Sequence, residues 1–280
     1  MLQRLLLCCT LLGGAAVSQA REPAAPGCGL LSVGFYDHGA LHYRGAEGGW
    51  TGIDQDVVNE LARRSGCRFF PLTESRVRIW AMLQSGALDM TVSGIATPER
   101  HKYARFVPYL AARNYLLLPK GVAAKVRNLD EFLADPGYKI GVVKSFKHGP
   151  TYDAWLDKLR AQGRVYDVAE YTALIKLLKI GRVQAVLSLA TSWGQLFKNP
   201  EFSDAFRAMD WAPRDTLVGA LVLSRQSVPL ETVELFDKHL REMRADGTLR
   251  AIFERHVDAD LAAGMLNYPN EPDADAHAHD

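Results

Sequence analysis

Ser93-Gly94-Ile95-Ala96-Thr97-Pro98-Glu99-Arg100, running on to Phe106-Val107-Pro108-Tyr109, ends an apolar strand-like run and opens a short helix. Thr97 is a residue type that caps helices, and Pro98 suits the first helical position, where its missing N–H costs nothing. The turn therefore brings together a hydroxyl, free backbone N–H groups and an arginine, which are groups that hold a carboxylate or another small anion. A capped helix with a solvated arginine is the alternative for this segment.

Strand-like apolar runs alternate with helical patterns on both sides of this segment, which predicts an α/β fold. We expect strands over residues 30–35, 68–72, 90–95, 115–118, 139–143, 165–168, 183–187 and 217–223. We expect helices around residues 57–62, 79–83, 128–133, 152–159, 172–178, 230–245 and 248–256. Trp80 falls at helical spacing with Ile79 and Leu83, so it is predicted to lie in the core.

The first residues have the pattern of an export signal. Arg4 precedes the apolar run 5–12, and Ser18-Gln19-Ala20 forms a small-residue cleavage site. The run is too short to span a membrane. We therefore expect a signal peptide over residues 1–20, cleaved near Ala20, and a periplasmic protein. The segment 269–280 is rich in Asp, Ala, Pro and His and is expected to be disordered.

Charge and cysteine content narrow the possible partners. The chain has 33 Lys and Arg against 32 Asp and Glu, which argues against nucleic acid or an acidic membrane surface as a partner. Cys28 and Cys67 lie beyond the predicted signal, each just before a predicted strand, and we favour a structural disulfide over two free thiols. No His or Cys spacing supports a metal site, so we expect no metal and no cofactor. We expect a monomer.

Several segments together resemble the extracellular solute-binding protein family 3, the periplasmic amino-acid-binding proteins of ABC importers. The matching segments are Gly52-Ile53-Asp54-Gln55-Asp56-Val57, Leu83-Gln84-Ser85-Gly86-Ala87-Leu88-Asp89, the Thr97 to Arg100 turn with Phe106 and Pro108-Tyr109, Gly181-Arg182-Val183-Gln184-Ala185, and Asp246-Gly247-Thr248. The resemblance implies a two-lobe periplasmic-binding-protein fold of type II with discontinuous lobes. Lobe 1 would hold residues 28–118 and 219–268, and lobe 2 residues 119–218, with crossover strands near 117–121 and 214–219.

The resemblance also implies ligand-binding residues in the cleft between the lobes. The family's Thr-x-x-Arg arginine holds the α-carboxylate of the ligand, and Arg100 takes that position, with Ser93 and Thr97 as its partners. Tyr36 and His38 follow the first strand, where the family often places a ligand-contacting aromatic residue. The alternatives are an arginine that orders its own turn, a threonine that only caps, and a surface loop at 36–38.

Three departures from the family pattern suggest an anionic ligand. Arg76 stands where many members carry an aromatic residue, and the region 187–191 lacks the acid that holds an α-ammonium group. The loop 143–149 adds Lys144 and Lys147. A buried ammonium without a counter-charge is costly, so the cleft suits an anion or a ligand with more than one carboxylate. Solvated loop charge is the alternative for these three residues. We assign Asp54 a structural role, capping the first helix and ordering its lobe.

The expected function is capture of a small solute, an amino acid or a more acidic organic anion, for delivery to an inner-membrane ABC permease, without enzymatic activity. One alternative is a periplasmic dehydratase of the cyclohexadienyl (prephenate/arogenate) type on the same fold. That reaction needs a general acid near the cleft, and Glu170 is the only nearby candidate. A second alternative is a sensory binding module that acts through a separate partner.

Overall fold

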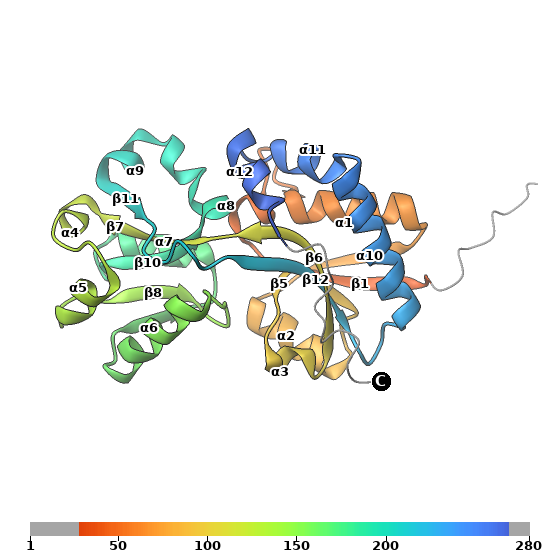
Figure 1. Ribbon diagram of the computed structural model, residues 1–280, viewed down its shortest axis with the longest axis horizontal. Coiled ribbons are helices and arrows are strands. Elements are labelled where there is room, and N and C mark those ends of the chain that lie inside the picture. The colour runs from red at the N-terminus through yellow and green to blue at the C-terminus, as the bar shows by residue number, and fades with distance from the viewer. Residues whose placement is uncertain (1–27, 269–280) are drawn as a thin grey trace, which may run out of the picture.

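The computed structural model describes residues 28–268, which form two lobes side by side (Figure 1). Each lobe is built on a five-stranded sheet with helices packed against it. The predicted α/β class and two-lobe architecture are confirmed. The predicted signal peptide 1–20 and the segment 269–280 lie outside the described residues. Within residues 28–268, no helix has both the length and the apolar character needed to span a bilayer.

The sheet of lobe 1 has the strand order β4-β1-β5-β12-β6. Its strands are β1 (Leu30–Phe35), β4 (Arg68–Thr73), β5 (Met90–Ile95), β6 (Ala104–Ala112) and β12 (Leu217–Ser224). Strand β1 runs parallel to β4 and β5, and β12 is antiparallel to β5 and β6. The helices are α1 (Ile53–Ser65), α2 (Arg76–Ser85), α3 (Pro98–His101), α10 (Leu230–Ala245), α11 (Thr248–Glu254) and α12 (Ala259–Met265). A 3-10 turn (Gly39–Leu41) and a small ribbon of β2 (Tyr43–Arg44) and β3 (Trp50–Thr51) complete the lobe.

The sheet of lobe 2 has the order β11-β7-β10-β8-β9. Its strands are β7 (Asn114–Pro119), β8 (Ile140–Val143), β9 (Val165–Val168), β10 (Ala185–Leu189) and β11 (Phe206–Met209). Strand β8 is parallel to β9 and β10, and β7 is antiparallel to β10 and β11. The helices are α4 (Lys120–Ala123), α5 (Leu129–Ala134), α6 (Pro150–Ala161), α7 (Tyr171–Lys179), α8 (Ala190–Trp193) and α9 (Pro200–Ala205), with a 3-10 turn at Leu196–Lys198.

The chain crosses between the lobes at two places. Strand β6 belongs to the first sheet and β7 to the second, so the first crossing lies at Arg113, several residues before the expected 117–121. The return runs from the end of β11 to the start of β12 at Leu217 and overlaps the expected 214–219. Arg113 pairs with the carboxylate of Asp210 and donates a hydrogen bond to the carbonyl of Pro213 at 2.9 Å, which ties the two crossings together.

The parallel strands determine where the cleft residues lie. The carboxyl ends of parallel neighbours meet at one edge of a sheet, and ligands of α/β proteins bind there. In lobe 1, Tyr36 follows β1, Arg76 follows β4 and the turn 96–100 follows β5. In lobe 2, the loop 144–149 follows β8. Residues far apart in sequence thus converge between the lobes.

The predicted bridge between Cys28 and Cys67 is present in the structure. Cys28 comes just before β1 and Cys67 just before β4, two strands that pair in parallel from Leu30 and Arg68 onward. The disulfide therefore fastens the start of the described chain to the edge strand of its own sheet.

Candidate functional site

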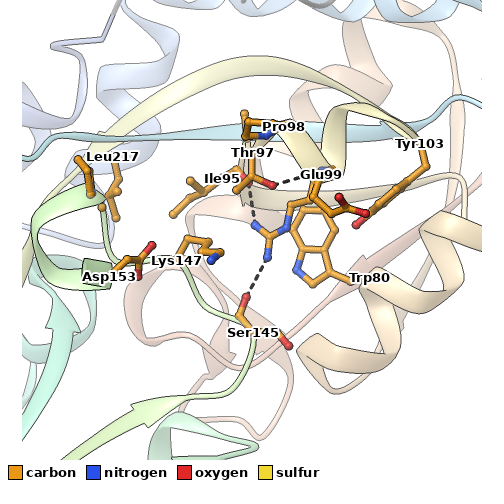
Figure 2. Close-up of a pocket in the computed structure, with 14 residues that line it drawn as sticks. Trp80, Ile95, Thr97, Pro98, Glu99, Tyr103, Ser145, Lys147, Asp153 and Leu217 are labelled. Carbon is orange, nitrogen blue, oxygen red and sulfur yellow. Dashed lines mark hydrogen bonds between the residues drawn. The ribbon is translucent and has the colours of Figure 1, made fainter. Parts of the chain in front are cut away.

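A cavity of about 870 Å³ lies between the lobes, within the size range of small-molecule sites. Lobe 1 supplies Trp80 and the turn after β5, and lobe 2 supplies the loop after β8 and the start of α6. Figure 2 shows side chains from both lobes around this cavity. Its lining is Trp80, Ile95, Ala96, Thr97, Pro98, Glu99, Arg100, Tyr103, Ser145, Lys147, Gly149, Pro150, Asp153 and Leu217.

The turn at one wall of the cavity folds as its sequence predicts. Thr97 is the N-cap of α3, and its hydroxyl accepts a hydrogen bond from the backbone N–H of Arg100 at 3.2 Å. Pro98 occupies the first helical position. The cap holds the single turn that carries Arg100, so Thr97 both lines the cavity and fixes the arginine.

Arg100 is buried at the contact between the lobes, with 7% of its surface exposed. Its guanidinium carbon lies 3.6 Å from the ring centre of Trp80, and its nitrogens donate to the carbonyls of Ile95 (2.7 Å) and Ser145 (2.8 Å), the latter in lobe 2. Burial, with a smaller effect from the charge of Arg76, lowers its pKa to about 10. Arg100 therefore remains cationic at neutral pH. The two carbonyls to which it donates are neutral, and Asp153 interacts with its charge through space.

The cavity wall also carries charges of both signs. Lys147 lines the cavity next to Asp153 of α6 (Figure 2). Burial raises the pKa of Asp153, while the N–H of His148, which donates to it at 3.0 Å, and the charge of Lys147 oppose that rise. The region 187–191 carries no acid, as the sequence shows, but α6 supplies a carboxylate to the cavity from another part of lobe 2. Glu99 lines the same cavity and pairs with Lys102 at 2.8 Å.

Arg76 does not lie in solvent, so the solvated alternative is wrong for this residue. It is 2% exposed, and its guanidinium carbon lies 4.3 Å from the ring centre of Tyr36 and 4.7 Å from that of Phe146 in lobe 2. Tyr36 is buried beneath it and donates to the carbonyls of Val92 and Ser93 at 3.3 and 3.1 Å. Arg76 lines a second interlobe cavity of about 410 Å³ that includes Tyr36 and Val143 but not Arg100.

His38 and Lys144 differ from each other in burial. His38 is 5% exposed and stacks on Phe146 at 5.3 Å, so the surface-loop alternative is wrong for it. Burial and the charge of Arg76 lower the pKa of His38 to about 3, which keeps it neutral at physiological pH. Lys144 is exposed and lines neither interlobe cavity, in keeping with a solvated loop charge.

Ser93 and Asp54 belong to a buried network beside the cavity. The hydroxyl of Ser93 and that of Tyr109 both donate to Oδ1 of Asp54, at 2.8 and 2.5 Å, and the Ser93 N–H donates to the Tyr109 hydroxyl at 2.9 Å. Both donors of Ser93 are thus used inside lobe 1, and it does not line the cavity. Asp54 orders its lobe as expected, but Gly52, not Asp54, is the N-cap of α1.

Three residues of the site went unrecognised in the sequence. Asp153 sits in the first turn of the helix after the lobe-2 loop, Trp80 lies one helical turn beyond Arg76, and Phe146 stands between two lysines. Trp80 was predicted to lie in the core; it is 8% exposed and carries Arg100 on its ring. The (i, i+4) spacing of Arg76 and Trp80 was the available signal for a shared helix face.

Known proteins were compared with the chain by sequence and by structure. The family of bacterial extracellular solute-binding proteins, family 3, matches residues 31–259. A probable histidine-binding protein of Campylobacter jejuni is 24% identical over 210 residues, which cover 74% of this chain and 76% of that protein. The L-cystine-binding protein TcyJ of Escherichia coli K12 is 24% identical over 249 residues, covering 83% and 84%.

A solved structure agrees in fold. An ancestral arginine-binding protein bound to arginine has a TM-score of 0.70 and 22% identity, and the match covers 81% of this chain and 98% of that one. The two lobes, the interlobe cavity and the family match over most of the described residues lead to one assignment. The chain belongs to the bacterial extracellular solute-binding proteins, family 3.

Proposed function

We propose that the protein is the periplasmic solute-binding component of an ABC importer, and that it binds a small carboxylate-containing solute in the cavity between its lobes. The solute would be delivered to an inner-membrane permease. Family membership and the binding functions named for its relatives support this proposal. The proposal also includes export of the protein with cleavage of a signal peptide near Ala20. It further includes that the protein acts as a monomer.

One observation supports it most strongly: the buried guanidinium of Arg100 in the wall of the interlobe cavity. A guanidinium pairs with a carboxylate through two parallel hydrogen bonds, and a desolvated cation attracts an anion more strongly than a solvated one does. Because lobe 2 also lines the cavity at Ser145, Lys147 and Asp153, a carboxylate bound to Arg100 would lie within reach of both lobes. Ligand contacts from both lobes would favour the closed state.

The opposite charge nearby supports a zwitterionic solute as well as a simple anion. Asp153 lines the cavity that Arg100 lines, and it offers a partner for an ammonium group. An α-amino acid would place its carboxylate at Arg100 and its ammonium group toward α6. The proposed solute class therefore includes amino acids and is not restricted to anions without an amine.

A thermal-shift screen over amino acids, dicarboxylates and keto acids tests the proposal. A solute that binds only the native state stabilises it by mass action, and at about 100 times its Kd we expect Tm to rise by roughly 5–10 °C. The proposal predicts that the stabilising compounds all carry a carboxylate. If none of the panel raises Tm, or if stabilisation does not depend on a carboxylate, the proposal is wrong.

A dehydratase of the cyclohexadienyl type is the second candidate, and Asp153 favours it. A half-buried carboxyl at the cavity wall, whose pKa is raised by that burial, is suited to act as a general acid. Incubation with prephenate, followed by the absorbance of the aromatic product, tests this reading. Turnover that disappears in Asp153→Asn would support an enzyme, and absence of product at high protein concentration would eliminate it.

A further inference from the structure

Arg76 is a buried cation without a hydrogen-bond acceptor. Its Nε, Nη1 and Nη2 all lie out of solvent, and none has an acceptor among residues 28–268. Leaving a charged donor buried and unpaired costs more than leaving a neutral one, so such groups are normally bonded. The rings of Tyr36 and Phe146 pack on the guanidinium and stabilise its charge. The charge of Arg76 also opposes the burial that raises the pKa of the Tyr36 hydroxyl, which itself donates to the carbonyls of Val92 and Ser93.

The position of Arg76 in α2 adds to the free-energy cost of burying its charge. Arg76 is the first residue of the helix, where the macrodipole is positive and a cation is unfavourable. Asp54 interacts with it through space but accepts its hydrogen bonds from Ser93 and Tyr109. Asp37, Glu74 and Glu170 line the same cavity as Arg76, but none of them accepts a hydrogen bond from its guanidinium. Burial raises the pKa of Asp54 to about 7, so this carboxyl is only partly ionised at neutral pH and compensates Arg76 incompletely.

Arg76 and Arg100 are also neighbours. Trp80 lies four residues after Arg76 on the same helix face, and Arg100 stacks on the Trp80 ring. Both arginines contact the same lobe-2 loop at consecutive residues, Arg100 at Ser145 and Arg76 at Phe146. The positive charge of Arg76 disfavours the protonated form of Arg100 and lowers the pKa of Arg100. Two adjacent buried cations are what a doubly charged anion would neutralise.

We propose that Arg76 is a second anion-binding position in the cleft, and that the solute therefore carries a second carboxylate besides the one bound at Arg100. Phe146 covers Arg76 in the present arrangement and belongs to lobe 2, so it leaves with its lobe when the cleft opens. The solute class is a small dicarboxylate, with or without an amine for Asp153. This inference rests on the proposed function and specifies its ligand.

Calorimetric titration with matched acid and amide pairs tests the proposal: L-glutamate with L-glutamine, L-aspartate with L-asparagine, and succinate with succinamate. Each pair differs in the charge of one group at nearly constant shape. We expect the wild type to bind at least one acid about tenfold or more tighter than its amide, because a hydrogen-bonded charge pair of this kind is worth at least that factor.

Three variants test whether the preference for the acid over the amide depends on Arg76. Arg76→Met keeps side-chain length and removes the charge, and it should abolish the preference by weakening binding of the acid at least about tenfold more than binding of the amide. Arg76→Lys keeps the charge without the planar fork and should retain part of the preference. Arg78→Met is the matched control on the same helix, since Arg78 is 65% exposed and pairs with Glu74; it should behave as wild type.

Melting of the ligand-free proteins provides a readout independent of binding. Arg76→Met removes an unpaired buried charge and should raise Tm, whereas a purely structural arginine would lower it on removal. The proposal is overturned if Arg76→Met keeps the acid preference, or if the wild type binds the amides as tightly as the acids. In those cases binding of a carboxylate solute still stands. If no compound of either kind binds, the proposed function fails and this inference falls with it.

Discussion

Asp54 illustrates how burial changes the protonation of a single carboxyl beside the cavity. Its side chain is 1% exposed and lies behind Ser93, whose backbone adopts a left-handed conformation with φ of 48°. Non-glycine residues seldom adopt that conformation, and they hold it where surrounding contacts impose it. The hydroxyls of Ser93 and Tyr109, both bonded to Asp54, supply such contacts.

The pKa of Asp54 predicts a pH dependence of stability. Native Asp54 keeps its proton up to about pH 7, whereas its ordinary pKa is 3.8. The native state therefore binds more protons than the unfolded state between these values, and the free energy of unfolding falls as pH rises through this window, by up to ~1.4 kcal/mol per pH unit. Asp54→Asn should lose this slope, as measured by urea unfolding at several pH values.

The exposed carboxylate of Asp157 provides the control. Its side chain is 77% exposed, so Asp157→Asn should keep the wild-type slope between pH 4 and 7. Parallel slopes for the wild type and Asp54→Asn would show that the native carboxyl titrates like an unfolded one, contrary to the account.

Sequence predicted the residues whose signals are local and missed those that depend on the other lobe. The cap at Thr97, the proline at 98 and the arginine at 100 form one short pattern, and the structure reproduces it. Arg76 is predicted as a ligand residue with solvated charge as the alternative, and the sequence cannot decide between them because Phe146, which covers Arg76, lies seventy residues away in the other lobe. Asp153 was missed for the same reason, since only the closed cleft brings it near Arg100.

At the scale of elements, the end of α5 depends on one arginine from another part of lobe 2. Arg164, just before β9, is 4% exposed and donates to backbone carbonyls at and beyond the end of α5. Its acceptors are the carbonyls of Phe132 (2.9 Å), Leu133 (2.8 Å), Asp135 (2.6 Å) and Tyr138 (2.7 Å). The last carbonyls of a helix have no partner within it, so this side chain replaces a cap.

Arg164→Ala should therefore destabilise lobe 2 by about 3 kcal/mol, because four buried or partly buried backbone hydrogen bonds are lost together. Arg164→Lys should keep little of the stability that Arg164→Ala loses, since an ammonium group cannot reproduce the five-donor fork. Denaturant unfolding measures both. Arg160→Ala, whose side chain is 43% exposed, is the control and should change stability by less than about 1 kcal/mol. Equal losses for Arg160→Ala and Arg164→Ala would contradict this role.

The sequence predicts strands β7 and β12 on either side of the crossings but does not predict the short helices α4, α8, α9 and α12. Gly66 and Gly86 end α1 and α2 in the left-handed conformation, with φ of 72° and 73°, as glycine commonly does at the end of a helix. Strand β6 was not predicted, because Pro108 and the preceding turn interrupt its apolar pattern. Its pairing with β12, more than a hundred residues later, is what forms it.

At the scale of the molecule, the Cys28–Cys67 disulfide closes a loop that contains β1 and α1. Its cysteines are 39 residues apart, for which the chain-entropy account gives a stabilisation of about 4 kcal/mol. The double variant Cys28→Ser/Cys67→Ser should lose most of this in denaturant unfolding, and wild type treated with a reductant should match it. Unchanged stability in both would mean that the bridge does not constrain the unfolded chain.

The two lobes are tied at the crossings and touch at the cleft. Arg113 joins the crossings through Asp210 and Pro213, while Arg100 and Arg76 contact the lobe-2 loop on the cleft side. This arrangement suits rotation of the lobes about the crossings, with the solute as the contact that favours closure. Under the proposed function, Arg100 is the residue on which that closure would depend most directly.

The most direct test of the account is a calorimetric titration of the wild type and Arg100→Ala with the carboxylate solute that stabilises the wild type most. The exposed Arg250→Ala serves as the control, since Arg250 pairs only within α11. The account predicts one site per chain in the wild type and the control, and at least about tenfold weaker binding in Arg100→Ala. Equal affinity of Arg100→Ala and wild type would contradict it.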